Sequence, residues 1–342
     1  MTKTIFVTGA SGFIAKHIVL KLLDAGYHVR GSVRTDARAD EVRAAMMAHL
    51  ADTADLDQRL SFVTLDLMSD KGWSTALKGV DALMHTASPF PLSEPTDEND
   101  LIRPAVDGSL RALGAAKSAG VNRVVLTSSV AAVYAQKVIP QQATYTEDDW
   151  TDPDSPAASA YVRSKTLAER AAWDFVAENP AIKLTTINPV LVLGPALDAK
   201  FGSSLEIIQR VLRGKDPAIP ALNFDIVDVR DIAEMHVAAL STPQSEGKRV
   251  IGSSGDMWFR DLALHLKSLY PARPITTRQA PNWFIRLYAL VDPTVRLILP
   301  TLGKRLTTDN ARAREMLGID FISPLDAAAA AAACLVEGDL VD

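Results

Sequence analysis

Short apolar runs alternate with longer helical patterns along the first two-thirds of the chain. Six runs are typical of buried β-strands: TIFVT (4–8), HVRGSV (28–33), LSFVTL (60–65), DALMHT (81–86), RVVLTS (123–128) and KLTTIN (183–188). Most of them are separated by predicted helices, at 12–25, 37–50, 98–119 and 160–178. This alternation predicts an α/β fold with a doubly wound parallel sheet, in which helices cover both faces.

The rhythm changes after Pro189. Glycine and proline punctuate residues 189–220, and the stretch 224–240 reads as the end of a strand that leads into a helix. We therefore expect two parts. The larger is formed by residues 1–188 and about 224–248, and the smaller, mostly helical C-terminal lobe is formed by about 189–223 and 249–342.

The last hundred residues are expected to be mostly helical. The apolar stretch 283–300 predicts a pair of amphipathic helices broken at Pro293, and its charged residues interrupt it too often for a bilayer span. A segment lying in a membrane interface is the alternative for this stretch. The alanine run 327–333 follows Pro324 and predicts a packed terminal helix.

Composition narrows the class of protein. Hydrophobic residues make up 48% and charged residues 23% of the 342, as in ordinary soluble domains. The net charge of −5, without blocks of like charge, indicates no nucleic-acid partner. The single cysteine, Cys334, excludes an intrachain disulfide framework, and the six histidines lack ligand spacing, so no metal is expected. A reducing compartment and the absence of a signal-peptide pattern suggest a cytoplasmic location.

A glycine-rich stretch, VTGASGFIA (7–15), connects the first predicted strand to the first helix. Gly9 permits a tight turn, Gly12 lets a pyrophosphate approach the helix N-terminus, and Ala15 allows the helix to pack on the strand. This position in the chain predicts dinucleotide binding. The expected cofactor contacts here are Gly9, Ser11, Gly12, Phe13 and Ile14.

The residue after the second strand distinguishes the two nicotinamide cofactors. An acidic residue there binds the ribose 2′-hydroxyl of NAD, but this chain has Arg34, with Arg38 close behind. A guanidinium suits the 2′-phosphate, so NADP(H) is preferred over NAD(H). Alternatively Arg34 is simply solvated and Asp36 reaches a ribose hydroxyl. Asp66, with Leu67, is placed to contact the adenine edge or to cap a helix.

Two polar motifs follow later in the chain. Tyr161 and Lys165 would share one helix face, where the ammonium favours the phenolate and lowers the pKa of the phenol. The pair could exchange a proton near neutral pH, or be a half-buried tyrosine beside a solvated lysine. Ser128 and Ser129 end a central strand, where a hydroxyl could bind a substrate carbonyl or cap the backbone.

Taken together, the motifs resemble the extended short-chain dehydrogenase/reductase family over nearly the whole chain. The similarity is greatest to the branch of dihydroflavonol reductase, cinnamoyl-CoA reductase and yeast-type carbonyl (aldehyde) reductase. The motifs that carry it are TGASGFIA, GSVR, HTASPF, LTSSVAAV, YVRSKTLAE, INPVLVLGP and VDVRDIA. The resemblance implies an NAD(P)-binding Rossmann fold with a smaller substrate-binding lobe.

The resemblance also implies residue roles. Ser129 would be the catalytic serine, with Ser128 as the alternative, Tyr161 the general acid, and Lys165 the residue that binds the nicotinamide ribose. An asparagine that extends a proton relay in many relatives has no counterpart in 102–109. Further residues would line the cofactor: Thr86, Ala87, Ser88, Thr127, Pro189, Val190 and Ser204.

The implied function is NADPH-dependent reduction of the carbonyl of a small neutral or aromatic aldehyde or ketone, reversible as alcohol oxidation. A nucleotide-sugar epimerase or dehydratase is one alternative, but Phe224 stands where such enzymes carry a diphosphate-binding arginine. A steroid-type dehydrogenase and a dinucleotide-sensing regulator are the others. No membrane partner is expected, and the helices at 98–119 and 160–178 leave a monomer or a homodimer open. The expected substrate contacts are Phe90, Tyr134, Phe201 and Phe224.

Overall fold

The computed structural model describes residues 2–88 and 97–341. In this part of the chain, seven parallel strands form one sheet in the order β10-β7-β5-β4-β1-β2-β3. The order reverses between β1 and β4, and at such a point the carboxyl ends of parallel strands leave a crevice. The strands are β1 (Thr4–Thr8), β2 (His28–Val33), β3 (Leu60–Thr64), β4 (Ala82–His85), β5 (Arg123–Thr127), β7 (Lys183–Pro189) and β10 (Lys248–Gly252).

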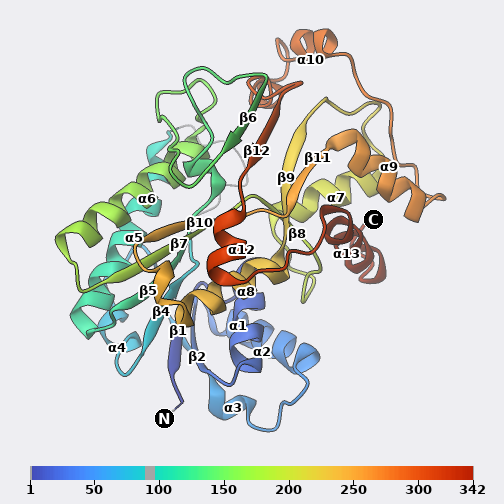
Figure 1. The fold of residues 1–342 in the computed structure, drawn as a ribbon. Helices are drawn as coiled ribbons and strands as arrows, with labels where there is room; N and C mark the ends of the chain where they lie inside the picture. The colour runs from blue at the N-terminus through green and yellow to red at the C-terminus, as the bar shows by residue number, and fades with distance from the viewer. Residues whose placement is uncertain (1, 89–96, 342) are drawn as a thin grey trace.

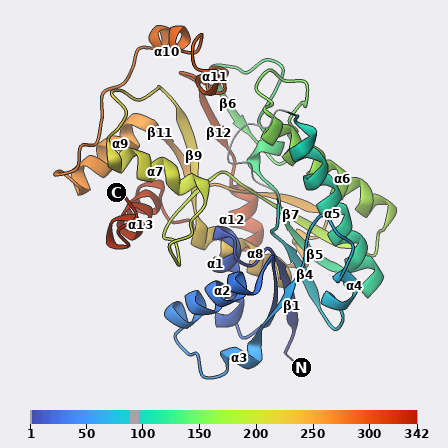
Figure 2. The same ribbon diagram turned by 180° about the vertical axis from the view of Figure 1, so that it is seen from behind.

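Helices cover both faces of this sheet (Figure 1 and Figure 2). Successive side chains of a strand point to opposite faces, and in β1 Ile5 and Val7 join one core while Phe6 joins the other. The Ile5 face carries α1 (Phe13–Asp24), α2 (Asp36–His49) and α8 (Val229–Ser241), with α12 (Ala311–Leu317) beside α8. The Phe6 face carries α4 (Trp73–Ala76), α5 (Asn99–Ala119) and α6 (Ala160–Glu178), and α3 (Leu56–Arg59) precedes β3. The predicted doubly wound parallel sheet is confirmed.

A second core forms around a smaller sheet within the described residues, in the order β11-β9-β8. Its strands are β8 (Leu191–Leu193), β9 (Asn223–Asp228) and β11 (Gly255–Trp258), and its helices are α7 (Ser203–Arg213), α9 (Phe259–Leu269) and α13 (Pro324–Glu337). A separate parallel pair joins β6 (Gln142–Tyr145) to β12 (Arg305–Thr308). In the chain, β6 follows strand β5 of the large sheet, and β12 comes after strand β11 of the small sheet. Their pairing therefore links the two cores.

The C-terminal hundred residues are less helical than expected. They contain β10, β11 and β12, and β10 belongs to the large sheet although residues from about 249 onward were expected in the smaller lobe. Conversely, β9 lies in the small sheet, and the helix that follows it, α8, lies on the large one. The hydrophobic pattern missed β10, β11 and β12 because each has only four or five residues and includes charged side chains.

Two of the C-terminal helix predictions are confirmed. Ser323 caps α13, where its hydroxyl accepts from Asp326 N at 3.2 Å, and the alanine run packs into the second core. In the stretch 283–300, α10 (Asn282–Tyr288) and α11 (Pro293–Arg296) are separated before Pro293. Several large apolar side chains of this stretch are exposed, Trp283 at 67% among them. Across residues 2–88 and 97–341, no helix has both the length and the apolar character that a membrane span needs.

Gly31 in β2 makes a testable contribution to stability. A Cβ there would lie 2.7 Å from Ala10 Cβ and 3.0 Å from the Phe62 ring, so Gly31→Ala must push the glycine-rich loop away from the strand. We expect the free energy of unfolding to fall by about 1–3 kcal/mol. Gly114, inside α5, has open space around it, and Gly114→Ala should raise that free energy by about 0.5–1 kcal/mol. Urea denaturation of both variants is the measurement, and effects of the same sign would contradict this account.

Candidate active site

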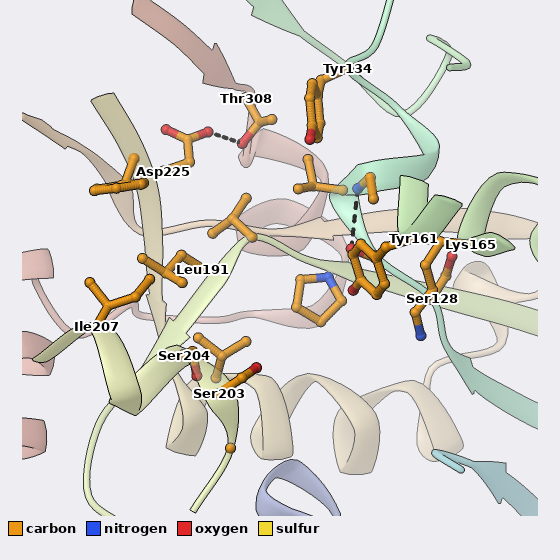
Figure 3. A pocket seen from close by; sticks show the side chains of 18 of the residues that line it. Ser128, Tyr134, Tyr161, Lys165, Leu191, Ser203, Ser204, Ile207, Asp225 and Thr308 are labelled. Carbon is orange, nitrogen blue, oxygen red and sulfur yellow. Dashed lines mark hydrogen bonds between the residues drawn. The ribbon is translucent and has the colours of Figure 1, made fainter. Parts of the chain in front are cut away.

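A cavity of about 770 Å³ opens at the carboxyl ends of the central strands, where it runs between the two sheets. The glycine-rich loop lies at one end of it. Tyr134, Tyr161 and Lys165 lie along one side, and Leu191, Ile207, Asp225 and Thr308 along the opposite side (Figure 3). The crevice predicted from the strand order therefore leads into a pocket shared by both cores.

The glycine-rich loop is shaped for a close approach of other groups. Gly9 has a φ of +63°, and a Cβ at this residue would lie 2.9 Å from Ala87 Cβ. The N-cap of α1 is Gly12, which offers no side-chain cap, so N–H groups of the first turn remain available to an anion. Gly9, Gly12, Phe13 and Ile14 line the cavity, whereas Ser11 does not.

The two arginines after β2 lie outside the cavity. Arg34 is exposed and forms no ion pair within residues 2–88 and 97–341. Arg38 donates to Glu41 at 2.8 Å, and Lys200 pairs with the same carboxylate. Arg34 is therefore the less engaged of the two cations. Asp36 is exposed at the start of α2.

Two more expected adenine contacts also lie outside the cavity. Asp66 is exposed, and its Oδ1 accepts from Met68 N at 2.9 Å, so it caps a local turn. Leu67 is half-buried and packs near Gly108 of α5. Asp66 therefore closes a turn and does not cap a helix, since the N-cap of α4 is Gly72, and its contact with adenine stays a prediction.

Strand β4 ends beneath the glycine-rich loop. The backbone N–H groups of Thr86 and Ala87 each donate to Thr8 Oγ1 at 3.1 Å. Thr86 and Ser88 line the cavity, while Ala87 packs against Gly9 instead. Three further predicted cofactor contacts line it, namely Pro189, Val190 and Ser204. Thr127 does too, but its hydroxyl is shared with His236 Nε2 at 2.7 Å.

The motif residues Ser129, Tyr161 and Lys165 meet on one wall. Ser129 caps the 3₁₀ turn η1 (Val130–Ala132), where its Oγ accepts from Ala131 N at 3.1 Å, and it also hydrogen-bonds the Tyr161 phenol. Helix α6 begins one residue before Tyr161 and carries Lys165 on the next turn, with Nζ 5.9 Å from the phenol ring centre. The fold thus brings together residues 32 positions apart in the chain.

Ser128 has a different environment from Ser129. It is buried, and its hydroxyl donates to Glu169 Oε2 at 2.6 Å. Because a serine hydroxyl has a single proton, Ser128 is committed to that carboxylate. Ser129 is left as the serine that contacts the phenol.

Burial shifts the pKa values of Tyr161 and Lys165 in the directions that favour their neutral forms. Desolvation raises the pKa of Tyr161 above its usual value, although its hydrogen bond with Ser129 acts against this. Desolvation lowers the pKa of Lys165 to about 8, although the nearby Glu169 carboxylate acts against it. The expected lowering of the tyrosine pKa is therefore wrong for this structure, because desolvation of the phenolate outweighs its stabilisation.

The residues expected to contact substrate are only partly brought together. Tyr134 and Phe224 line the cavity, and burial raises the pKa of Tyr134 to about 12. Phe201 does not line it, because its ring packs into the second core. Phe90 lies outside the described residues.

Sequence reasoning missed an acidic group in the cavity wall. Asp225 on β9 accepts from the Thr308 hydroxyl at 2.6 Å, and burial raises the pKa of this carboxyl to about 6 (Figure 3). Residues Leu306–Thr308 of β12 line the cavity beside it. A single acid in a short strand gives no sequence signal. No group of three His, Cys, Asp or Glu side chains that could hold a metal ion occurs in the described part of the chain.

The chain is similar to several known reductases. Cinnamoyl-CoA reductase 1 of Arabidopsis thaliana is 34% identical over 278 residues, which cover 81% of this chain and 77% of that one. Dihydroflavonol 4-reductase of Zea mays is 33% identical over 282 residues, covering 80% and 76%. The crystal structure of yeast methylglyoxal/isovaleraldehyde reductase Gre2 complexed with NADPH superposes with a TM-score of 0.81 at 30% identity, covering 99% of this chain and 100% of that one.

These similarities confirm the resemblance predicted from the motifs. The sequence profile of the NAD dependent epimerase/dehydratase family matches residues 5–252. The matched segment contains the glycine-rich loop, the strand-end serines and the Tyr-x-x-x-Lys pair, and it spans well over half of the sequence. This protein therefore belongs to the NAD dependent epimerase/dehydratase family.

Proposed function

We propose that this protein is an NADPH-dependent reductase that converts the carbonyl of a small neutral or aromatic aldehyde or ketone to an alcohol, and the reverse. The observation that carries the proposal is that Ser129, Tyr161 and Lys165 line the same cavity as Gly9 and Gly12. The named relatives are reductases, and the yeast Gre2 structure contains NADPH.

The residues around the loop fit a dinucleotide. The space at Gly9, which a Cβ would fill, and the uncapped first turn of α1 suit a pyrophosphate. Lys165 would hold the nicotinamide ribose, and Arg34 and Arg38 the 2′-phosphate. When bound, the nicotinamide supplies a hydride to the carbonyl carbon.

The chain's own residues would manage the charge on the carbonyl oxygen. Since Ser129 Oγ accepts from Ala131 N, its hydroxyl proton can point toward that oxygen. Tyr161 lies beside it as the second donor, and donors placed where negative charge develops stabilise the transition state. The raised pKa of Tyr161 keeps its proton in place at neutral pH, so that the phenol can deliver it to the alkoxide.

We assign cofactor binding to a larger domain of residues 1–188 and about 224–248, and substrate binding to a smaller lobe of about 189–223 and 249–342. The cavity supports this division through β8, α7 and β12, which supply much of the wall that faces Tyr161, but β9, within 224–248, contributes to the same wall. Strand β10 belongs to the larger sheet and β9 to the smaller.

The nucleotide-sugar alternative receives no support from the cavity. A sugar diphosphate needs cationic partners, and no arginine is found among the described residues that line the wall. Phe224, at the place expected for such an arginine, packs edge-on against Phe259 with ring centres 5.5 Å apart. The two lining lysines are Lys165 and Lys304, and the Lys304 ammonium donates to Ile139 O at 2.7 Å.

A screen of NADPH consumption tests the proposal. It should cover aldehydes, ketones, keto esters and dihydroflavonols, with NADH in parallel. Turnover of at least one neutral carbonyl class with NADPH is expected. Absence of turnover with every class, together with tight NADPH binding, would instead favour a dinucleotide-sensing regulator.

Replacing Tyr161 with phenylalanine tests the proton donor. The ring still packs but the proton is lost, so we expect kcat to fall by at least about 100-fold while the Kd for NADPH barely changes. Ser129→Ala should lower kcat more than Ser128→Ala, because the Ser128 hydroxyl is committed to Glu169. Steady-state kinetics and a fluorescence titration of NADPH are the measurements. A Tyr161→Phe enzyme with near-wild-type kcat would rule out this role.

Replacing Arg34 with glutamine tests the cofactor preference. Loss of a charge-assisted contact to the 2′-phosphate should weaken NADPH binding by about 1.5–3 kcal/mol and leave NADH binding nearly unchanged. Arg38→Gln should have a smaller effect, because Glu41 already engages Arg38. The control is Arg43→Gln, which removes a cation of the same helix, α2, that pairs with Asp57 of α3. Equal weakening of both cofactors by Arg34→Gln would show that Arg34 does not distinguish them.

A further inference from the structure

Helix α6 carries a third polar residue on the face of the motif pair. Glu169 lies one turn beyond Lys165 and two turns beyond Tyr161, and its side chain is fully buried, with an exposure of 0%. A buried carboxylate is costly unless several donors surround it. Five side chains donate to this one: Ser128 Oγ at 2.6 Å, Asn188 Nδ2 and Arg249 Nε at 2.7 Å, Thr186 Oγ1 at 3.1 Å and Trp173 Nε1 at 3.2 Å.

These hydrogen bonds hold the Ser128 side chain and the Ser129 carbonyl group, next to the Ser129 hydroxyl. Ser128 precedes Ser129 and is bonded to Glu169 directly. Asn188 uses the same amide group to donate to Glu169 Oε2 and to the Ser129 carbonyl oxygen, the latter at 3.2 Å. The carboxylate therefore fixes where Ser129 stands relative to α6, and so relative to Tyr161.

The cation that pairs with Glu169 comes from the far edge of the sheet. Arg249 on β10 also donates to the carbonyl oxygens of Glu147, Asp149 and Ala132, and its guanidinium stacks 3.7 Å from the Trp150 ring centre. Ala132 is the last residue of η1, the turn that Ser129 caps. The buried pair thus supports the Ser129 turn from both sides.

Glu169 also acts on Lys165 through its charge. Burial lowers the pKa of Lys165, and Glu169 is the group that opposes this. Tyr161 shares the helix face but stays neutral at physiological pH, since its pKa is raised.

The other charged groups around Lys165 act on it less. His85 faces it from β4, and burial, then Lys165 itself, lowers the pKa of this imidazole to about 4, so the ring is neutral at pH 7. Helix α5 packs along α6, but its Arg103 and Asp107 are exposed to solvent, and its Arg111 is paired with Asp70. Strand β7 carries Lys183 at its first residue, at the opposite end of the sheet, and turn η1 carries no charged residue.

We propose that Glu169 is a positioning residue of the active site: its carboxylate fixes the Ser128–Ser129 segment against α6, and its charge keeps the Lys165 ammonium protonated. This role rests on the proposed reductase chemistry. It assigns a function to a buried acid that does not line the cavity.

The test is the pH dependence of kcat for carbonyl reduction in Glu169→Gln. Glutamine keeps the size but removes the charge, so Lys165 should lose its proton at lower pH. We expect the alkaline limb of the kcat profile to move down by about one pH unit. We also expect kcat to fall at the plateau, because a glutamine amide cannot accept from all five donors.

Two controls separate charge from packing. Arg249→Met breaks the same buried pair but keeps the anion, so it should lower Tm without moving the alkaline limb to lower pH. Ser128→Ala removes one hydrogen bond and no charge, and its limb should coincide with that of the wild type. If Glu169→Gln does not fold, the double variant E169Q/R249M removes both members of the ion pair, so neither is left without its partner, and the alkaline limb should still move to lower pH.

The outcomes are distinguishable. An alkaline limb in the folded Glu169→Gln or double variant that coincides with the wild type overturns the proposal even if kcat falls, because a purely structural defect lowers kcat alike at every pH. Tyr161→Phe is measured in parallel. If it remains active, the proposed chemistry itself is wrong, whereas an inactive Tyr161→Phe with an unmoved limb in Glu169→Gln overturns only the role of Glu169.

Discussion

The ion pair between Glu169 and Arg249 joins the helix of the Tyr-x-x-x-Lys motif to the edge strand of the large sheet, with both charges withdrawn from water. Desolvating two ions costs several kcal/mol each, so such a pair persists only when every remaining donor and acceptor has a partner. Here the carboxylate receives five side-chain donors, and the guanidinium reaches three backbone carbonyls and an aromatic face. The positions of α6, β7, β10 and the Ser129 turn therefore depend on one another.

This dependence explains which strands the pattern could predict. Strands β1, β4, β5 and β7 are buried on both faces, and that burial selects the continuous apolar runs seen in the sequence. Strand β10 begins with Lys248 and Arg249, which a hydrophobic pattern reads as surface. Arg249 is buried only because it pairs with Glu169, which lies 80 positions earlier in the chain. A pairing of that kind is tertiary, and no local pattern signals it.

The sequence likewise predicted one part of the candidate site and missed another. The glycine-rich loop, Ser129 and the Tyr-x-x-x-Lys pair were found because each must present a particular backbone or side chain at a strand or helix end. The opposite wall was largely missed. Asp225 and Thr308 lie in short strands of the second core, and they meet only because β12 packs beside β9. Phe201 was expected in the wall for its apolar ring, but an apolar ring is equally suited to the second core, where it packs.

Burial shifts the pKa values of Tyr161 and Lys165 in opposite directions. It raises the pKa of the Tyr161 phenol, which suits the proton-donor role that we propose for it. The same burial lowers the pKa of Lys165 to about 8, which works against a group that is to remain a cation. A water-exposed lysine would avoid this conflict, but it could not share an enclosed pocket with the phenol. An anion one turn away on the same helix opposes this lowering, and that anion is itself stable in the interior only because Arg249 and the four other donors surround it.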